Sequence, residues 1–192
     1  MKKLFSEIPY MESERLIIKR VEDQDAEALS KMTQSKAVYR YLPTFLLEQQ
    51  GDDIHEVIGQ LYEDCYLKKQ NLILGIYLKE GMTFCGLAEY YGYKDILRKT
   101  CIGYRLIEEF WGKGIASEAV SLMIDYLYCD TDIRTITASV MKDNSASAHV
   151  LEKNGFKMLL KAIPEDWGYE KLTIASKWFR EKHKNYKRIN NK

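Results

Sequence analysis

Several features that mark particular classes of protein are missing from this 192-residue sequence. Its 29 lysines and arginines barely exceed its 28 aspartates and glutamates, so it lacks the basic excess of a dedicated nucleic-acid surface. No stretch approaches the roughly 20 apolar residues of a membrane-spanning helix. Residues 1–10 lack the apolar run of a signal peptide. We therefore expect a cytoplasmic protein whose partners include neither nucleic acid nor a membrane.

Metal-binding patterns are absent as well. The four cysteines form no C-x-x-C pair, and the three histidines are scattered without a second ligand at metal-site spacing. We expect no metal. The cysteines stand within apolar or periodic segments, which predicts reduced core residues at Cys65, Cys85, Cys101 and Cys129.

A pair of glycines opens a long helical pattern in the middle of the chain. Residues 101–107 alternate like a strand, Gly112 and Gly114 follow, and apolar residues then recur at helical spacing. The first amides of such a helix lack carbonyl partners and suit a phosphate, although a plain turn would explain the two glycines equally well. A Walker loop is excluded by Ile107 and Gly114, and a dinucleotide fingerprint by Ser117.

Periodicity also predicts the other elements of one domain spanning residues 1–192, with a core over about 13–179. We expect helices over residues 23–32, 48–69 and 145–153, and strands over 15–21, 72–78, 83–91, 134–140, 156–163 and 169–178. Asp143 or Asn144 can cap the third helix. The aromatic connection 35–47 either selects a substrate or only packs between the two helices that it joins. The basic residues 180–192 are expected to form a frayed, solvated tail, with an accessory contact to an acidic partner as the alternative.

Three segments together carry a family resemblance. Residues 110–120, 142–147 and 150–156 resemble the GNAT acetyltransferases, and closely the branch of ribosomal-protein N-terminal acetyltransferases. The resemblance implies an α/β (α+β) GNAT fold, with a mixed, mostly antiparallel sheet of about seven strands, splayed at the cofactor cleft and flanked by about four helices. It also implies acetyl-CoA as co-substrate and a primary amine as acceptor, either a protein N-terminus or a small molecule such as a polyamine or an aminoglycoside-like compound. The sequence leaves open whether the protein is a monomer or a homodimer.

The same resemblance suggests which residues hold acetyl-CoA. Backbone groups of the strand would bind the pantetheine arm like an added strand, and the loop amides would bind the pyrophosphate, with Lys113 adding charge. The implied residues are Arg105, Leu106, Ile107, Gly112, Lys113, Gly114, Ile115, Ala116, Ser117 and Asn144.

The chemical groups depart from the commonest family pattern. Leu151 occupies the place of the usual tyrosine acid, but Asn144 and Ser147 match the Asn-x-x-Ser of the ribosomal-protein branch, which makes Ser147 the candidate near the sulfur. Cys101 replaces a frequent glutamate, so Glu89 on the preceding strand, or a water relay, would have to deprotonate the amine. Without the resemblance, Asn144 is a helix cap, Ser147 a surface serine and Glu89 an exposed carboxylate.

Two other functions compete with an acetyltransferase that works by direct attack of the amine. A noncatalytic acyl-CoA-binding module is compatible with the missing tyrosine and glutamate. A scaffold that keeps the fold alone should fail to bind CoA, and the joint presence of Gly112, Gly114, Ala116 and Asn144 argues against it.

Overall fold

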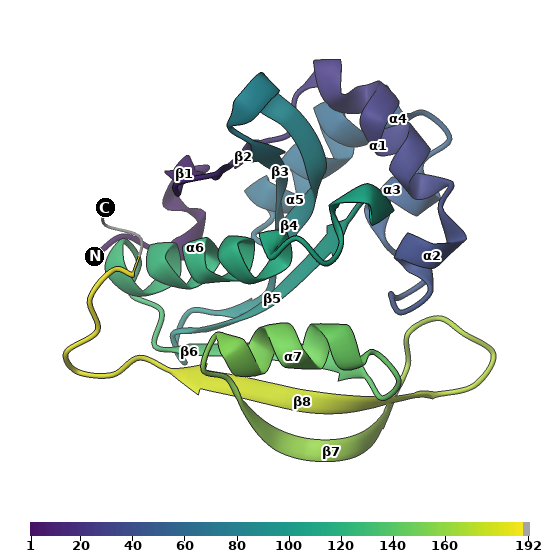
Figure 1. The fold of residues 1–192 in the computed structure, drawn as a ribbon. Helices are drawn as coiled ribbons and strands as arrows, with labels where there is room; N and C mark the ends of the chain where they lie inside the picture. Colours follow the sequence, from purple (N-terminus) through teal and green to yellow (C-terminus); the bar gives the residue numbers. More distant parts are fainter. Residues whose placement is uncertain (190–192) are drawn as a thin grey trace.

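A computed structural model describes residues 1–189, and in these residues eight strands form a single sheet (Figure 1). The strand order is β1-β2-β3-β4-β5-β6-β8-β7, and only β5 and β6 pair in parallel. This confirms the expected mixed, mostly antiparallel sheet, with the very short β1 as an addition. The strands are β1 Met11–Glu12, β2 Leu16–Arg20, β3 Asn71–Leu78, β4 Thr83–Lys94, β5 Lys99–Leu106, β6 Thr135–Met141, β7 Lys157–Glu165 and β8 Thr173–Glu181.

The helices fall into two groups along the chain. The first five are α1 Ala26–Thr33, α2 Lys36–Tyr39, α3 Leu47–Gln50, α4 Ile54–Glu56 and α5 Tyr62–Leu67, with a π-helical turn, Val57–Leu61, joining the last two. The other two are α6 Ile115–Cys129 and α7 Ser145–Lys153. The predicted helix over 48–69 was wrong at its start. Gly51 is extended and ends α3, and the Asp53 side chain then caps α4 by accepting the His55 amide at 2.9 Å.

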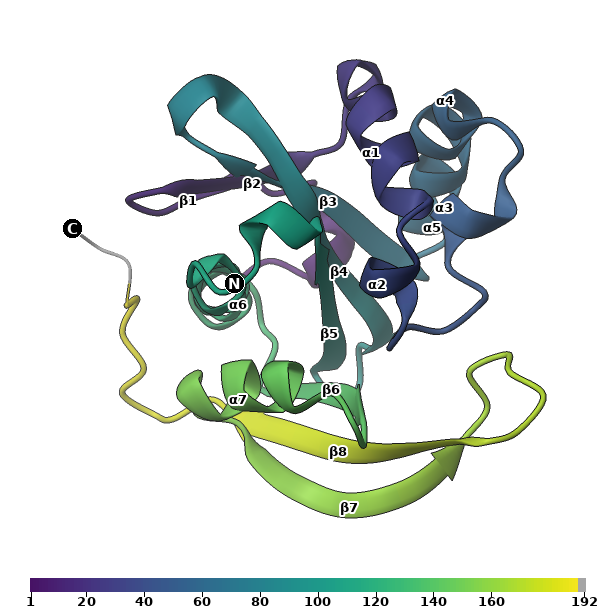
Figure 2. The same ribbon diagram turned by 45° about the vertical axis from the view of Figure 1, so that its right-hand side comes forward.

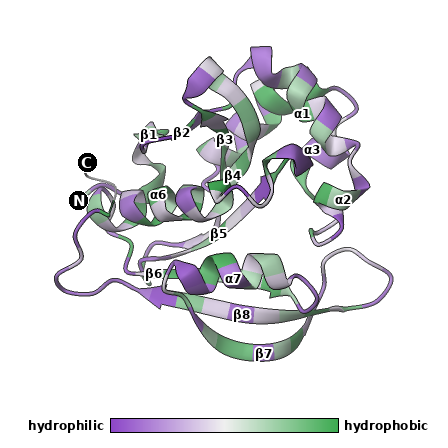
Figure 3. Ribbon diagram, in the orientation of Figure 1, coloured by the Kyte–Doolittle hydropathy of each residue, from purple (hydrophilic) through white to green (hydrophobic). Residues whose placement is uncertain are grey.

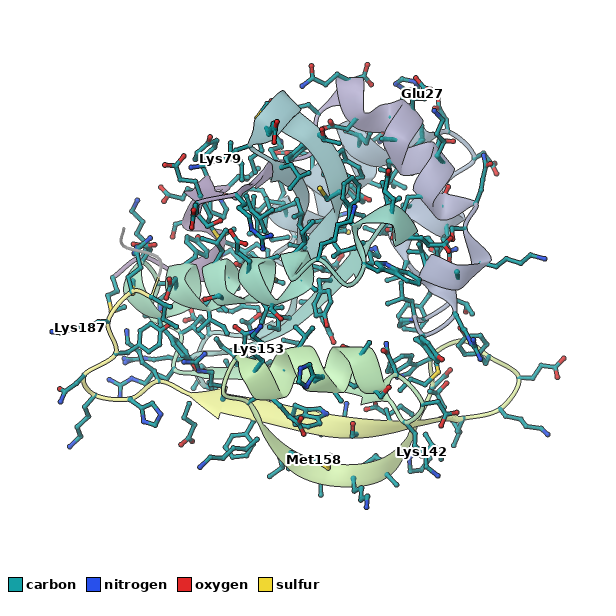
Figure 4. The ribbon with its side chains drawn as sticks, in the orientation of Figure 1. Glu27, Lys79, Lys142, Lys153, Met158 and Lys187 are labelled. Carbon is teal, nitrogen blue, oxygen red and sulfur yellow. The ribbon has the colours of Figure 1, made fainter. Side chains whose placement is uncertain are left out.

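These helices cover the two faces of the sheet (Figure 2). On one face α6 and α7 pack over a core that includes Leu74, Tyr90 and Ile102, and on the other α1 to α5 pack over Ile73, Tyr77 and Leu87. At the edge of the sheet, β7 exposes its apolar residues Met158, Leu159 and Leu160 (Figures 3 and 4). The sheet is therefore covered by packed helices on both faces.

The sheet opens between β5 and β6. The two strands pair only at Lys99 to Cys101 with Thr135 to Thr137, whereas β5 stays paired with β4 as far as Leu106. Beyond Cys101 the two strands therefore diverge, and β5 presents one backbone edge to the gap. This is the splay that the resemblance implied.

The chain end is better anchored than expected. β8 continues to Glu181, and the residues after it return along α6, where the Tyr186 hydroxyl donates to the Asp125 carboxylate at 2.7 Å. Arg188 pairs with Asp130 at 2.7 Å. The prediction of a frayed tail was therefore wrong over residues 182–189, because Asp125 of α6 and Asp130 directly after it provide partners for Tyr186 and Arg188. Residues 190–192 of that tail lie outside the described residues.

Three sequence expectations concern the cysteines, membrane-spanning helices and metal sites. All four cysteines are free thiols, but only Cys85 is fully buried, and the other three are half-buried, which corrects the expected core placement. Over residues 1–189, no helix combines the length and apolar character needed to cross a membrane. The same residues contain no group of three or more His, Cys, Asp or Glu placed to hold a metal ion.

Candidate active site

A cavity of about 1300 Å³ is lined by residues from both sides of the gap in the sheet. One end is lined by the glycine loop and the start of α6, the middle by the free edge of β5 and by α7, and the other end by the 35–47 connection and the β7–β8 loop. Residues from both halves of the chain therefore face the same space.

The glycine loop has the backbone geometry that its sequence predicts. Gly112 and Gly114 have φ values of 71° and 78°, in the left-handed region that favours glycine. Gly114 is the N-cap residue of α6, and a Cβ placed on Gly112 would meet no atom within 4 Å. The cavity is lined here by Gly112, Gly114, Ile115, Ala116 and Ser117. Open backbone at a helix N-terminus fits an anionic ligand.

The cations around this loop differ from expectation. The Lys113 side chain lies over the Phe110 ring, with its Nζ 5.8 Å from the ring centre, and Lys113 is not among the residues that line the cavity. Lys153 of α7, labelled in Figure 4, does line it. Sequence reasoning gave Lys153 no role, because α7 was interpreted only through Asn144 and Ser147.

An ion pair ties the loop to the start of β2. Arg15 contacts Glu118 in the first turn of α6 at 2.5 Å and donates to the Lys113 carbonyl at 3.1 Å. Ser13 donates to the same carboxylate at 2.6 Å. Burial acts to raise the pKa of Glu118, but the hydrogen bonds from Ser13 and Arg15 outweigh it and leave that pKa below 4.5. The loop is therefore held in place before any ligand arrives.

The edge of β5 offers fewer free backbone groups than expected. The Ile107 amide donates to the Cys85 carbonyl at 2.9 Å, and the Arg105 carbonyl lies against Gly86 of β4. Ile107 therefore does not provide the unpaired amide that was expected of it. Backbone groups alternate along a strand, so those of Leu106 face the gap, where the Trp111 indole donates to the Leu106 carbonyl at 2.8 Å.

The start of α7 holds two of the predicted residues. The Asn144 side chain caps the helix by accepting the Ser147 amide at 3.1 Å, which confirms the predicted cap. The Ser147 hydroxyl is half-buried and lies 3.1 Å from the Tyr104 hydroxyl of β5. Burial raises the pKa of Tyr104 to about 12, so the phenol keeps its proton at neutral pH. Strand alternation places Tyr104 on the same face as Ile102 and Leu106, but sequence reasoning gave its hydroxyl no chemical role.

The Glu89 carboxylate is buried, not exposed as the sequence alone favoured. It lines the cavity with 5% of its surface exposed, accepts a hydrogen bond from Asn71, and lies 3.0 Å from Nη1 of Arg105. The Arg105 Nε lies 2.5 Å from Glu48 of α3. Sequence reasoning missed both the Arg105 side chain and Glu48, because nothing local links these positions. Cys101, where the resemblance implies a glutamate, contacts Thr137 at 3.0 Å.

Two loops that line the cavity, the 35–47 connection and the β7–β8 loop, lie on the same side of the molecule (Figures 1 and 2). The Thr44 amide donates to the Trp167 carbonyl at 2.9 Å, and the Tyr169 hydroxyl donates to the Leu42 carbonyl at 2.7 Å. Gly168 has φ 82°, and a Cβ there would overlap the Thr44 hydroxyl. We call the paired segments 42–45 and 164–169 the loop bridge. It joins the halves of the chain that the splayed strands separate.

A sheet that splays beside a helix beginning with an open glycine loop matches the acetyltransferase fold that the sequence resemblance implied. The family model for the acetyltransferase (GNAT) domain matches residues 15–157. The chain belongs to the GNAT family of N-acetyltransferases, and it is an enzyme of that family.

Individual relatives agree with this assignment. An uncharacterized N-acetyltransferase of Bacillus subtilis, YoaA, is 31% identical over 149 residues, which cover 78% of this chain and 83% of YoaA. Among solved structures, RimL, a ribosomal L7/L12 alpha-N-protein acetyltransferase in complex with coenzyme A, gives a TM-score of 0.74 at 18% identity and covers 90% of this chain and 98% of its own. Spermidine N-acetyltransferase of Vibrio cholerae, in complex with CoA and spermine, gives a TM-score of 0.72 at 16% sequence identity. The match covers 86% of this chain and 95% of that structure's chain. At such identities the two structures show a shared fold.

Proposed function

We propose that this enzyme transfers the acetyl group of acetyl-CoA to a primary amine, either a protein N-terminus or a small molecule such as a polyamine. One observation carries the proposal. A continuous cavity joins the open amides of the glycine loop to the buried carboxylate of Glu89, with Leu106, Tyr104 and Ser147 between them. One part of this cavity would bind the anionic donor and another the amine, with groups that can move protons lining the same space.

The residues of the cleft fit acetyl-CoA. Gly112, Gly114 and the first residues of α6 would hold the pyrophosphate through their amides, with Lys153 as a nearby cation. The backbone of Leu106 faces the gap and would hold the pantetheine arm, and Asn144 would help to orient it. When bound there, acetyl-CoA supplies an activated acyl group as a thioester.

Glu89 would act at the amine. An amine attacks a carbonyl only in its neutral form, so the ammonium must lose a proton first. The Glu89 carboxylate lies in the cavity wall and would accept that proton. Glu89 would thereby act as the base in place of the family glutamate, whose position is occupied by Cys101. Buried carboxylates also attract a cationic acceptor into the cavity.

Ser147 would act at the sulfur. The leaving thiolate needs a proton, which the Ser147 hydroxyl in the cavity lining would donate. The protonated Tyr104 phenol lies 3.1 Å from that hydroxyl and can donate a proton back to Ser147. The Leu106 amide would stabilise the oxyanion that forms as the amine adds to the carbonyl. The balanced result is an N-acetylated amine, the CoA thiol and one released proton.

The first experiment follows thiol release from acetyl-CoA in the presence of N-terminal peptides, polyamines and amino sugars. Gly114→Glu serves as the cofactor-blocked variant, because it strains the loop and puts a carboxylate where the amides face an anion. Gly81→Glu is its matched control. Gly81 has φ 70° in the exposed β3–β4 turn, so the same substitution there meets similar backbone strain away from the cavity.

We expect turnover with at least one amine class, retained by Gly81→Glu and lost by Gly114→Glu. Equal activity of the two variants would show that the glycine loop does not bind acetyl-CoA. Binding of CoA without thiol release across the panel would favour the noncatalytic module instead.

A further inference from the structure

A buried ion cluster stands beside the amine end of the cavity. The Arg105 guanidinium lies between two carboxylates, with its Nε 2.5 Å from Glu48 and its Nη1 3.0 Å from Glu89. The three residues come from β5, α3 and β4, and none exposes more than 5% of its surface. Of the three, Arg105 and Glu89 line the cavity. We call Glu48, Arg105 and Glu89 the buried triad.

The buried triad carries one negative charge in excess. Its two carboxylates face a single guanidinium, and burial raises the pKa of the neighbouring Tyr39 and Tyr62 hydroxyls, which therefore stay neutral and add no charge of either sign. Tyr39 donates to Glu48 at 3.0 Å. A buried excess charge is costly unless a partner compensates it. The acceptor ammonium is the cation that would complete the cluster.

The contacts of Glu89 hold its carboxylate in one orientation. One oxygen accepts from the Asn71 amide, and the other accepts from Arg105. A carboxylate oxygen can accept more than one hydrogen bond, so each retains capacity towards the cavity. Arginine suits this position because it can approach two carboxylates at once, with Nε towards Glu48 and Nη1 donating to Glu89, whereas lysine presents a single point charge.

We propose that Arg105 is a positioning residue for amine transfer: anchored by Glu48, it fixes the Glu89 carboxylate in the cavity wall, where Glu89 receives the acceptor ammonium and its proton. The inference rests on the proposed function and deepens it, because Arg105 had been assigned only a backbone role towards acetyl-CoA. It predicts that the effect of Arg105 on catalysis passes through Glu89 and not through the acyl donor.

A double-mutant cycle tests this pathway. The variants are Arg105→Lys, Glu89→Gln and their combination, assayed with the best acceptor of the panel. We expect Arg105→Lys to lower kcat/KM for the acceptor by about tenfold or more and to leave KM for acetyl-CoA within about twofold. In the Glu89→Gln background the same substitution should change kcat/KM by less than about twofold, because the group it positions is already gone.

Two controls separate positioning from folding. Arg20→Lys makes the same substitution in the half-exposed ion pair between β2 and Glu63 and should leave kcat/KM unchanged. If Arg105→Lys fails to fold, Glu48→Gln replaces it in the cycle, since it removes the anchor of Arg105 and keeps the guanidinium.

The outcomes distinguish this inference from the proposed function. Effects of Arg105→Lys and Glu89→Gln that multiply in the double variant, or a loss of acetyl-CoA affinity with kcat intact, would show a structural role and overturn the inference while the enzyme remains an amine acetyltransferase. A wild type that binds CoA but acetylates no amine overturns both.

Discussion

At the scale of single residues, Ser147 links the fold of a helix to the chemistry of the cleft. Its amide is the group that the Asn144 side chain caps, and its hydroxyl meets the Tyr104 phenol. The cap fixes the first turn of α7, and the first turn fixes where the hydroxyl points. A serine one position earlier or later would turn about 100° away from Tyr104 on the helix.

Removing the Ser147 hydroxyl should slow acetyl transfer. We expect Ser147→Ala to lower kcat by about 100-fold, the scale of a lost general acid, and Tyr104→Phe by about fivefold, the scale of one lost hydrogen bond. Because burial raises the pKa of Tyr104 to about 12, the phenol stays protonated below that pH. The wild-type rate should therefore not fall between about pH 7 and about pH 10 through loss of this proton.

Steady-state kinetics across that pH range checks the prediction. Ser145→Ala is the matched control, because Ser145 is exposed at the start of the same helix. If Ser147→Ala kept a kcat within twofold of that control, Ser147 would have no part in protonating the thiolate.

Some of these residues could be found from sequence and others could not. Asn144 and the glycine loop are local signals, because a cap and a left-handed turn each depend on a few neighbouring residues. The buried triad depends on three elements that meet only in the folded sheet. Glu48 looked like an ordinary helix residue, and Glu89 like the polar side of a half-exposed strand. The spacing of apolar residues along the chain gives no information about an ion pair between distant segments.

At the scale of elements, the loop bridge is the feature that periodicity describes least. The connection 35–47 was expected either to select a substrate or to pack, and the structure shows Tyr41, Pro43 and Phe45 lining the cavity. Asp166 and Trp167 line it from the other loop. The hydrogen bonds from Thr44 and Tyr169 hold both sets in place. We infer that the bridge shapes the acceptor end and leaves the glycine loop unaffected.

Gly168→Ala should disturb the bridge specifically. The substitution places a Cβ against the Thr44 hydroxyl and strains a backbone with φ 82°, at a cost of about 1–2 kcal/mol for the strain alone. We expect KM for the acceptor to rise about fivefold or more, while the Kd for CoA changes by less than about twofold.

Gly81→Ala provides the comparison, because its φ is 70° but its Cβ would meet only the Thr83 hydroxyl, at 3.4 Å. Acceptor KM from initial rates and CoA binding by calorimetry give the two readouts. A matching loss of CoA affinity in Gly168→Ala would show that the bridge acts on the whole cleft.

The errors in element boundaries share a cause. The apolar stripe continues from residue 47 into α5, so periodicity alone joined α3 to the helix that follows, whereas Gly51 and Asp53 break the backbone there. The last strand was placed too early because Leu172 and Tyr169 belong to an exposed loop. Long alternating or helical runs such as β6 and α6 had no such interruption, and their predictions are confirmed.

At the scale of the molecule, the sheet consists of two parts held by a short seam. Strands β1 to β5 form one part and β6, β8 and β7 the other, and the seam between them is the parallel pairing at Lys99 to Cys101. The loop bridge joins the parts at the far side of the cavity. The sequence pattern predicted the strands, but it could not show where their pairing stops. Only the family resemblance implied the splay.

A ligand that fills the gap should therefore stabilise the whole molecule. CoA would contact α6 and β5 in one part and α7 in the other, so that unfolding either part would release it. At a concentration of 100 times its Kd, a ligand specific for the native state adds about 2.7 kcal/mol. For a protein of this size that corresponds to a rise in Tm of roughly 5–10 °C.

Thermal unfolding with and without CoA measures this rise in Tm. We expect no CoA-dependent rise in Gly114→Glu and the full wild-type rise in Gly81→Glu. Hydrogen exchange locates the shift. Because the backbone of Leu106 faces the gap while the Ile107 amide already donates to Cys85, CoA should slow exchange at Leu106 more than at Ile107. Equal protection of both amides would mean that CoA stabilises the protein without binding along the edge of β5.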